Sequence, residues 1–257
     1  MDISIIILNY KSEHYLVRCL DSLRKHLTGL AYEIIVINND ESDLLSLCPA
    51  NDLHIIHNQQ NEGFAKACNK AANLAKGEIL FFLNPDTEIL LGNLVDLKNA
   101  FNDSSVGIVA PQLLISPTKI QPWNAGFKIS LWEILANNLG YIHSKIFWSK
   151  GSDLTPDWVS GAALTIKKSL FENIQGFDEN FFMYFEDVDL CKRVKEKSLT
   201  MVILPTVQVL HIGGQSASTT AEQKKQYYAS QDYYFKKHFG QFQLFCLKLL
   251  RSLSMIF

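Results

Sequence analysis

The chain has 257 residues, 47% of them hydrophobic and 19% charged, which is typical of a globular protein with one large α/β domain or two small ones. Its formal net charge of −2 gives no basic field, so we expect no nucleic-acid partner. The five cysteines are scattered and never in CxxC spacing, which argues against a zinc site or a disulfide framework and favours a reducing compartment.

The first part of the chain alternates between predicted strands and helices. Short apolar runs bounded by turn residues predict buried strands, and apolar residues at helical spacing predict helices. The expected strands cover residues 3–8, 33–37, 53–56 and 79–83. One helix follows Ser12, a residue type that caps helices, and another follows residues 61–64. This β-α-β-β-α-β order predicts a mostly parallel sheet with helices on its faces.

The rest of the chain has weaker patterns. The expected elements are a helix over 94–101, a strand over 106–110, a loop and short-helix region over 116–151, a polar-to-apolar segment over 158–166, a short helix over 169–174, a helix from 186 to about 197, strands over 201–204 and 207–210, a polar loop over 216–220 and an amphipathic helix over 221–239. The region over 116–151 either covers the site or is a packed excursion without chemistry. We divide the chain into a domain over 1–220 and a C-terminal amphipathic helical segment over 221–257.

Asp86 stands just past the carboxyl end of the expected strand over 79–83, in the sequence GEILFFLNPD. In open α/β sheets, ligands bind at that edge. A carboxylate there, two residues after Asn84, can hold a divalent cation through oxygen ligands. Asn, Pro and Asp are also ordinary turn formers, so a plain turn explains the same residues.

Polar residues follow other strands at the same predicted edge. Asn9 and Tyr10 come after the first strand, and the polar stretch 38–43 comes after the second. Loops in this position can bind a base and a ribose, although turn formation alone also explains them. Residues 61–64 precede a helix N-terminus, where backbone N–H groups favour an anion; Asn61 is equally a simple cap.

Glu186 and Asp187 form a second acidic site at the start of a predicted helix. Four aromatic residues between 181 and 185 precede them, an apolar setting that raises a carboxylate's proton affinity and suits a general base. Favourable placement of acids at a helix N-terminus is the alternative. His211 ends a predicted strand and is a metal ligand, an acid–base group or a core histidine.

Five segments of the chain together resemble the family-2 inverting nucleotide-sugar glycosyltransferases of the GT-A fold, most closely their bacterial rhamnosyltransferase-like branch. The segments are SIIILNYKSEHYLVRCLDSL, EIIVINNDESD, NEGFAKACNKAANLAKGEILFFLNPDTEI, WVSGAALTIKKSLFENIQGFDENFFMYFEDVDLCKRV and VQVLHIGG, and they lie between about residues 3 and 214. Their order and spacing carry the resemblance. It implies a Rossmann-like α/β fold with a mixed, mostly parallel central sheet, helices on both faces and C-terminal helices.

The resemblance implies roles for individual residues. Asp86 matches the retained ligand of the family's DXD-type metal motif, Asp187 matches its general base beside Glu186, and His211 matches a histidine that completes the metal shell in some members. The positions assigned to the nucleotide-sugar pocket are Asn9, Tyr10, Asn38, Asp40, Asn61, Gly63, Phe64, Asn69, Asn84 and Asp86. The positions assigned to the acceptor side are Trp158, Ser160 and Gly161.

Two positions depart from the family pattern. Many relatives carry an Asp that binds the base where Asn38 stands, and Asn adds a donor while lacking the charge, which leaves the nucleotide open. Asn84 replaces the first Asp of the metal motif, a form that is common in the rhamnosyl branch.

The implied activity is an inverting transfer of a sugar from a nucleotide-diphosphate donor to a hydroxyl of a saccharide or lipid-linked saccharide, assisted by Mg²⁺ or Mn²⁺. The expected donor is dTDP-rhamnose, with UDP-sugars as the alternative. A nucleotidyltransferase is a further alternative, but residues 9–13 lack the Gly-rich, basic loop that such enzymes carry. A nucleotide-sugar-binding module with an inactive site is another.

The C-terminal segment mixes basic and apolar residues. The basic residues Lys236, Lys237, Lys248 and Arg251 lie among Phe239, Phe242, Leu244, Phe245, Leu247, Leu249, Leu250, Leu253, Met255, Ile256 and Phe257. This pattern favours docking at an anionic membrane surface or, equally, packing on the domain or on a second subunit as a homodimer. We expect no signal peptide and no membrane span, hence a cytoplasmic enzyme that works at the inner face of the cell membrane in building the cell envelope.

Overall fold

The computed structural model describes residues 1–44, 52–149, 155–213 and 220–254. Its strands are β1 (Ile3–Asn9), β2 (Tyr32–Asn38), β3 (Leu53–His57), β4 (Ile79–Leu83), β5 (Thr87–Leu91), β6 (Val106–Ser116), β7 (Lys119–Ile120), β8 (Ala125–Gly126), β9 (Trp158–Val159), β10 (Ala163–Lys167) and β11 (Thr200–His211). Its helices are α1 (Glu13–Arg24), α3 (Phe64–Leu74), α4 (Val95–Asn99), α5 (Leu131–Asn138), α6 (Ile146–Ser149), α7 (Lys168–Asn173), α8 (Glu186–Lys195) and α9 (Thr220–Ser254), with 3-10 turns η1 (Ala100–Asn102) and η2 (His143–Lys145).

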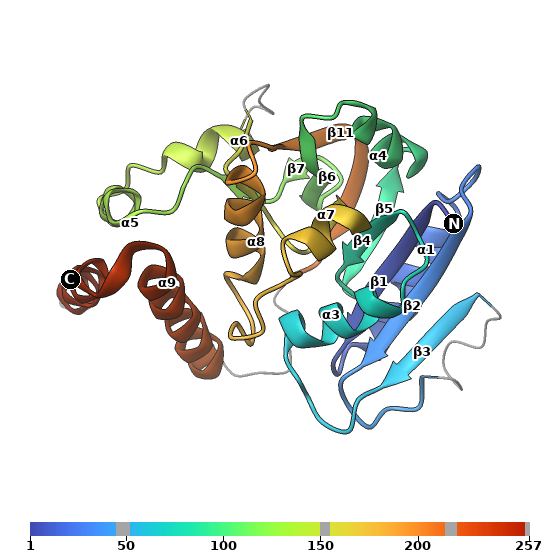
Figure 1. The fold of residues 1–257 in the computed structure, drawn as a ribbon, viewed down its shortest axis with the longest axis horizontal. Helices are drawn as coiled ribbons and strands as arrows, with labels where there is room; N and C mark the ends of the chain where they lie inside the picture. Colours follow the sequence, from blue (N-terminus) through green and yellow to red (C-terminus); the bar gives the residue numbers. More distant parts are fainter. Residues whose placement is uncertain (45–51, 150–154, 214–219, 255–257) are drawn as a thin grey trace.

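A mixed sheet forms the centre of the molecule (Figure 1). Within the described residues it has nine strands, in the order β3-β2-β1-β4-β10-β6-β11-β5 with β7 attached to β6. The pairs among β3, β2, β1 and β4 are parallel, as the apolar strand runs predict. β10 runs antiparallel between β4 and β6, and β11 is parallel to β6 but antiparallel to β5. The short strands β8 and β9 pair separately.

The two faces of the sheet carry different helices because side chains alternate along each strand. Ile6 of β1 faces the cluster that contains the alanines of α3 and buried residues of α7, α8 and α9. Ile5 and Ile7 face the cluster that contains α1 and α4. The sheet is therefore covered on both faces, as its continuous apolar strands require.

The parallel register brings the carboxyl ends of the first strands to one edge. Asn9, the last residue of β1, lies opposite Asn38, the last residue of β2. Ile7 lies opposite Leu83, so the Asn84–Asp86 turn begins at the same edge. β10 starts there as well, since Ala163 pairs with Leu83 and the Ala162 carbonyl accepts a hydrogen bond of 2.8 Å from the Asn84 N–H.

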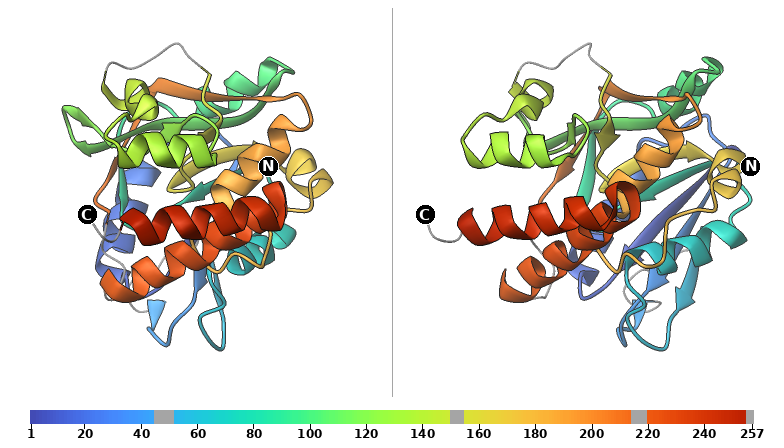
Figure 2. Two further views of the ribbon diagram at one scale, coloured as in Figure 1. Left: turned by 90° about the vertical axis from the view of Figure 1, so that its left-hand side faces the viewer. Right: turned by 60° about the vertical axis from the view of Figure 1, so that its left-hand side comes forward.

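The C-terminal helix α9 folds back on itself at Gly240, which has φ 83° and ψ 178° (Figure 2). Arg251 of the second arm donates hydrogen bonds to Gln231 (2.7 Å) and Asp232 (2.8 Å) of the first arm. Tyr234 and Leu247 are buried in the core cluster beneath α8. The amphipathic helix expected over 221–239 is therefore present and packs on the domain; the division of the chain at residue 220 stays a prediction.

Several elements differ from expectation. The strand β5 was not expected, because Thr87–Leu91 follows a turn-forming stretch without a clean alternation. The two strands expected over 201–204 and 207–210 are one strand, β11, whose register with β6 shifts between Leu204 and Gln208. The segment 158–166 divides into β9 and β10, and the irregular region over 116–151 contains α5 and α6.

Ser12 is the N-cap residue of α1, as expected, and its carbonyl accepts the N–H of Leu16 at 2.9 Å. Its hydroxyl makes no hydrogen bond to the first turn of α1 and donates instead to the Tyr10 carbonyl (2.9 Å). Cys48, the polar loop at 216–219 and residues 255–257 lie outside the described residues. No helix in the part of the chain that the structure describes has the length and apolar character needed to cross a membrane.

We predict that Gly240→Ala destabilises the protein. The backbone conformation at this kink is essentially restricted to glycine, and placing an L-residue there costs about 1–3 kcal/mol. No atom of the described residues lies within 4 Å of an added Cβ, so the cost comes from backbone strain alone. Urea unfolding measures the change, and Gln241→Ala, at the exposed next position, is the control. An unchanged unfolding midpoint for Gly240→Ala would contradict the observed kink.

Candidate active site

A single cleft with a volume of about 1140 Å³ contains both predicted acidic sites. Asp86 enters it from the turn after β4, and Asp187 enters from the first turn of α8. His211, from the end of β11, lies beside Asp86. Side chains from chain segments far apart in the sequence therefore meet at the edge where the parallel strands end.

The pairing of β5 with β11 sets the position of His211. Thr87 lies opposite His211, and the Ile212 N–H donates to the Asp86 carbonyl at 3.0 Å. This register brings the Nε2 atom of His211 to 3.3 Å from Oδ1 of Asp86 and 3.4 Å from Nδ2 of Asn84. The two residues of the predicted metal motif and the histidine thus form one cluster.

Gln121 orients the imidazole of His211. Its Oε1 atom lies 2.8 Å from Nδ1 of His211, and because an amide oxygen only accepts, Nδ1 carries the proton. Nε2 then faces Asp86 and the amide group of Asn84. A second hydrogen-bonded group that fixes the tautomer is the usual companion of a metal-ligating histidine.

The cluster fits a divalent cation. One carboxylate and one imidazole face the same point, and both side chains are largely buried. Across residues 1–44, 52–149, 155–213 and 220–254, no group of three His, Cys, Asp or Glu side chains is placed to hold a metal ion. The protein would therefore supply Asp86 and His211, and the remaining oxygen ligands would come from a diphosphate and water, as is common for Mg²⁺ sites.

Backbone N–H groups hold the carboxylate of Asp187 in place. The Gly161 N–H donates to Oδ2 at 2.7 Å, and the Val188 N–H donates to Oδ1 at 2.8 Å. Burial raises the pKa of Asp187, and these N–H groups counteract only part of that increase. Asp187 is therefore a fixed carboxylate with a raised proton affinity, which suits a general base.

Glu186 lies beside Asp187 and is 7% exposed. Its Oε2 atom has no hydrogen-bond partner among the described residues. Burial and then the charge of Asp187 raise the pKa of Glu186 well above its ordinary value. Burial thus raises the proton affinity of both carboxyl groups of the pair.

The turn before α8 has an unusual backbone. Tyr184 and Phe185 are consecutive non-glycine residues with φ angles of 69° and 68°. Left-handed conformations of this kind cost about 1–2 kcal/mol per residue, so the surrounding contacts must maintain them. The general-base candidate thus follows directly on a strained segment.

Asn9, Asn38 and Asp40 form a network at the carboxyl ends of β1 and β2. Asn9 Nδ2 donates to Asn38 Oδ1 (2.9 Å), and Asn38 Nδ2 donates to the Ser42 carbonyl (2.8 Å). Asp40 accepts from the Ser42 N–H at 2.8 Å. None of these three side chains lines the cleft, whereas Tyr10, another residue assigned to the nucleotide, does.

Asn61, Gly63 and Asn69 are also outside the cleft lining. Asn61 Oδ1 accepts from the Gly63 N–H at 3.0 Å. Asn69 on α3 pairs with the backbone of Phe177, donating at 2.8 Å and accepting at 2.9 Å. Phe64 and Asn84, by contrast, line the cleft. The nucleotide-binding roles of all these residues stay predictions.

Trp158, Ser160 and Gly161, assigned to the acceptor side, line the cleft next to Asp187. The indole N–H of Trp158 donates to the Phe127 carbonyl at 3.0 Å, which joins β9 to the segment before α5. Their role in acceptor binding stays a prediction.

One wall of the cleft is formed by α5 and both arms of α9, through Glu133, Ile134, Asn137, Asn138, Gln223, Lys224, Tyr227, Tyr228, Gln231, Leu247 and Arg251. The α5 part agrees with the expectation that the region over 116–151 covers the site, whereas the α9 part was not expected from the sequence. The adjacent Tyr227 and Tyr228 on the amphipathic helix are the sequence feature that could have indicated a binding surface there. Only the fold shows that they line the same cleft as Asp86 and Asp187.

Comparison with known proteins gives a family match and several relatives. A model described as glycosyl transferase family 2 matches residues 4–188. The low-salt glycan biosynthesis hexosyltransferase Agl10 of Haloferax volcanii is 28% identical over 218 residues, which are 82% of this chain and 67% of that protein. The N-acetylglucosaminyl-diphospho-decaprenol L-rhamnosyltransferase of Mycobacterium tuberculosis is 44% identical over 54 residues, 21% of this chain and 18% of that protein.

A similar arrangement occurs in a crystal structure of GalNAc-T7 with UDP, GalNAc and Mn²⁺. The TM-score is 0.63 at 16% identity, and the match covers 91% of this chain and 50% of that chain. This chain therefore spans only half of that structure. The likeness confirms the expected fold class, a GT-A fold with a mixed central sheet. The sheet is not mostly parallel as expected, because β10, β5 and β7 pair antiparallel with their neighbours.

We predict that Gln121→Leu weakens metal binding at the Asp86–His211 cluster. Loss of the acceptor for Nδ1–H frees the ring and its tautomer, and such changes cost about 10- to 100-fold in metal affinity. Calorimetric titration with Mn²⁺ in the presence of UDP measures the effect. Gln208→Leu, also a glutamine replacement and on the same strand as His211, is the control. Equal Mn²⁺ affinity in the two variants would show that Gln121 does not orient a ligand.

Proposed function

The chain belongs to glycosyl transferase family 2, and from that premise we propose that it transfers a sugar from a nucleotide-diphosphate donor to a hydroxyl acceptor. The convergence of Asp86 and Asp187 in one cleft carries the proposal. The first can bind the donor's diphosphate through a cation, and the second can activate the acceptor. The two groups that a metal-assisted sugar transfer needs thus line the same cleft.

The donor's diphosphate is assigned to the Asp86 end of the cleft. Asp86 and His211 would hold Mg²⁺ or Mn²⁺, which when bound neutralises the charge that develops on the leaving diphosphate. Gln121 keeps Nε2 of His211 directed at that point. The Mn²⁺ in the GalNAc-T7 structure, a protein of the same fold, supports a divalent metal.

Asp187 is assigned to the acceptor. Its carboxylate removes the proton of the acceptor hydroxyl while that oxygen attacks the anomeric carbon from the side opposite the leaving diphosphate. The Gly161 and Val188 N–H groups hold the carboxylate during this step. A single displacement of this kind inverts the anomeric centre.

The proposed donor is dTDP-rhamnose, with a UDP-sugar as the alternative. Similarity to the mycobacterial rhamnosyltransferase supports rhamnose. Many relatives bind the base through an aspartate at the position of Asn38. Here the Asn38 amide oxygen and nitrogen already form hydrogen bonds with Asn9 and Ser42, so the base would be bound differently. A panel of dTDP-, UDP- and GDP-sugars, assayed with and without EDTA, distinguishes these donors.

The proposed acceptor is a saccharide or a lipid-linked saccharide that enters between α5 and α9. The second arm of α9 exposes Phe242 (77%), Phe245 (66%) and Leu249 (52%) on one face, beside Lys248. Exposed aromatic residues flanked by a basic residue support contact with an anionic membrane on the cytoplasmic side. A homodimer through the same face is the alternative, and vesicle flotation compared with sedimentation separates the two.

We predict that Asp187→Asn lowers kcat by about 10²- to 10⁴-fold, because the amide cannot accept the acceptor's proton. The KM for the nucleotide sugar should change little, since the donor's diphosphate is assigned to Asp86. Release of the nucleoside diphosphate measures turnover, and Asp103→Asn, which changes an exposed acid in the turn before β6, is the control. Undiminished turnover in Asp187→Asn would exclude this residue as the base, and no turnover by the native chain with any donor would favour an inactive binding module.

The pH dependence of the reaction should report the raised pKa of Asp187. The base works as a carboxylate, so kcat/KM should rise with pH through a pKa that burial places above the range of an exposed aspartate. Glu186→Gln removes the neighbouring acid and keeps Asp187, so the acidic limb should remain. Loss of the limb in Glu186→Gln would show that Glu186, not Asp187, is the group whose ionisation limits the reaction.

A further inference from the structure

One face of the first arm of α9 packs against the segment that leads into Asp187. Its residues Tyr227, Ser230, Tyr234, Lys237 and His238 follow helical spacing, and we call them the α9 clamp. Building on the proposed function, we infer that the α9 clamp positions Asp187 for proton removal by holding α8 and the strained turn before it. These residues are positioning groups, because they act on the base through other parts of the chain.

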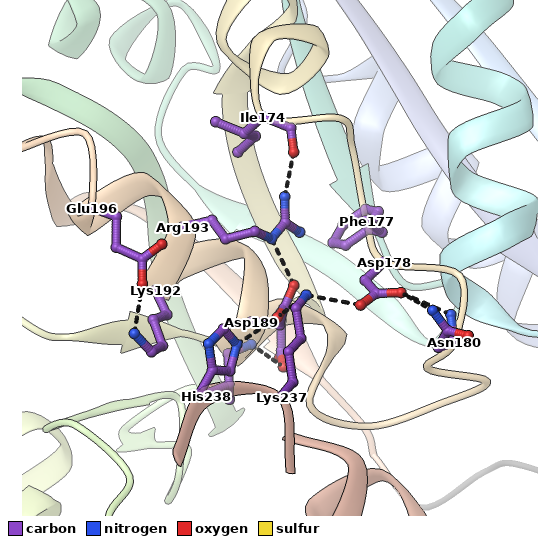
Figure 3. A network of polar contacts seen from close by, with 12 residues as sticks. Ile174, Phe177, Asp178, Asn180, Asp189, Lys192, Arg193, Glu196, Lys237 and His238 are labelled. Carbon is purple, nitrogen blue, oxygen red and sulfur yellow. Dashed lines mark hydrogen bonds and ion pairs between the residues drawn. The ribbon is translucent and has the colours of Figure 1, made fainter. Parts of the chain in front are cut away.

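Asp189 is the anchor of the α9 clamp on α8 (Figure 3). This carboxylate is fully buried and accepts hydrogen bonds from Lys237 Nζ (2.6 Å), His238 Nε2 (2.7 Å) and Arg193 Nε (2.7 Å). Burial favours its neutral form, but the His238 hydrogen bond and the charges of Arg193 and Lys237 hold the pKa of Asp189 below its ordinary value. A buried carboxylate with three donors is costly to disturb, so it ties α9 firmly to α8.

Lys237 also binds the loop that precedes α8. Its Nζ atom lies 2.8 Å from Oδ2 of Asp178, and the Tyr233 hydroxyl donates to the same carboxylate at 2.9 Å. One lysine therefore bridges Asp178, which precedes the strained turn, and Asp189, which follows it (Figure 3). Movement of this segment would separate a buried charge from its partners.

The strained turn itself contacts the α9 clamp. The Ser230 hydroxyl donates to the Met183 carbonyl at 2.7 Å, directly before Tyr184. The ring centroid of Phe185 lies 5.3 Å from the ring centroid of Tyr227 and 5.4 Å from that of Tyr234. These contacts supply the support that two consecutive left-handed residues need.

The anchor and the base lie on different sides of α8. Residues two apart are separated by about 200° around a helix axis, so Asp189 faces α9 while Asp187 faces the cleft. Neither Lys237 nor His238 lines the cleft. Changing them replaces no cleft-lining side chain, so a fall in kcat with a shifted pH profile and an unchanged KM is the signature expected of a displaced Asp187.

The test compares His238→Leu and Lys237→Met with His238→Gln, whose side-chain amide keeps an N–H donor for Asp189. We expect the first two variants to lower kcat by about 10- to 100-fold with little change in the KM for the nucleotide sugar, since small displacements of a catalytic group have effects of this size. His238→Gln should restore most of the rate. Lys225→Met, a charge removal at an exposed position of the same helix, is the control and should behave like the native chain.

The pH profile separates positioning from general loss of stability. If Asp187 moves away from the Gly161 N–H, it loses a hydrogen bond that stabilises the carboxylate, so its pKa rises and the acidic limb of kcat shifts to higher pH. That shift should accompany His238→Leu and Lys237→Met and should be absent from His238→Gln and Lys225→Met.

Unchanged kcat and an unmoved acidic limb in folded His238→Leu and Lys237→Met would overturn the inference, as would an effect confined to KM. If circular dichroism shows that these variants do not fold, Ser230→Ala takes their place, because it removes only the bond to the Met183 carbonyl and leaves no buried charge unpaired. Native-like kcat and pH profile in folded Ser230→Ala would then overturn it. Absence of turnover in the native chain, in contrast, would count against the proposed function itself.

Discussion

The burial of two adjacent carboxylates at the start of α8 is the constraint on which the rest of the site depends. Glu186 and Asp187 have raised pKa values chiefly because they are buried, and the N-terminal end of α8 offsets only part of that cost. The left-handed turn before them adds backbone strain. Such an arrangement persists only where neighbouring groups hold it from several sides, and here Gly161 holds it from the cleft side and α9 from behind.

The mixed topology of the sheet explains how the two ends of the cleft come together. The parallel strands β1 and β4 deliver the Asn84–Asp86 turn to the carboxyl edge. The antiparallel strand β10 starts at that edge, so the residues just before it, including Gly161, lie beside the same turn. The pairing of β5 with β11 then places His211, the last residue of β11, next to Asp86. A purely parallel sheet would bring strand ends together but would not deliver the starts of strands to the same edge.

The C-terminal helix has a larger part in the site than its position in the chain indicates. The family match ends at residue 188, whereas α9 begins at Thr220. Even so, both arms of α9 line the cleft, and the α9 clamp binds the carboxylate two residues beyond the base. Three of the basic residues that suggested a membrane contact, Lys237, Lys248 and Arg251, form ion pairs within the chain. Among the described residues, Phe242, Phe245 and Leu249 leave an exposed apolar surface on the second arm of α9.

The amino-acid sequence by itself determined the parallel strands of the first part, the helices between them, the edge at which Asp86 stands and the acidic start of α8, because these depend on local periodicity and turn chemistry. It could not determine that Thr87–Leu91 pairs with β11, that Gln121 orients His211 or that α5 and α9 form a wall of the cleft. Each of these joins residues distant in the chain, and their local patterns fit several partners equally well. Only tertiary packing selects one partner, since burial of the whole core decides which register and which helix face are satisfied together.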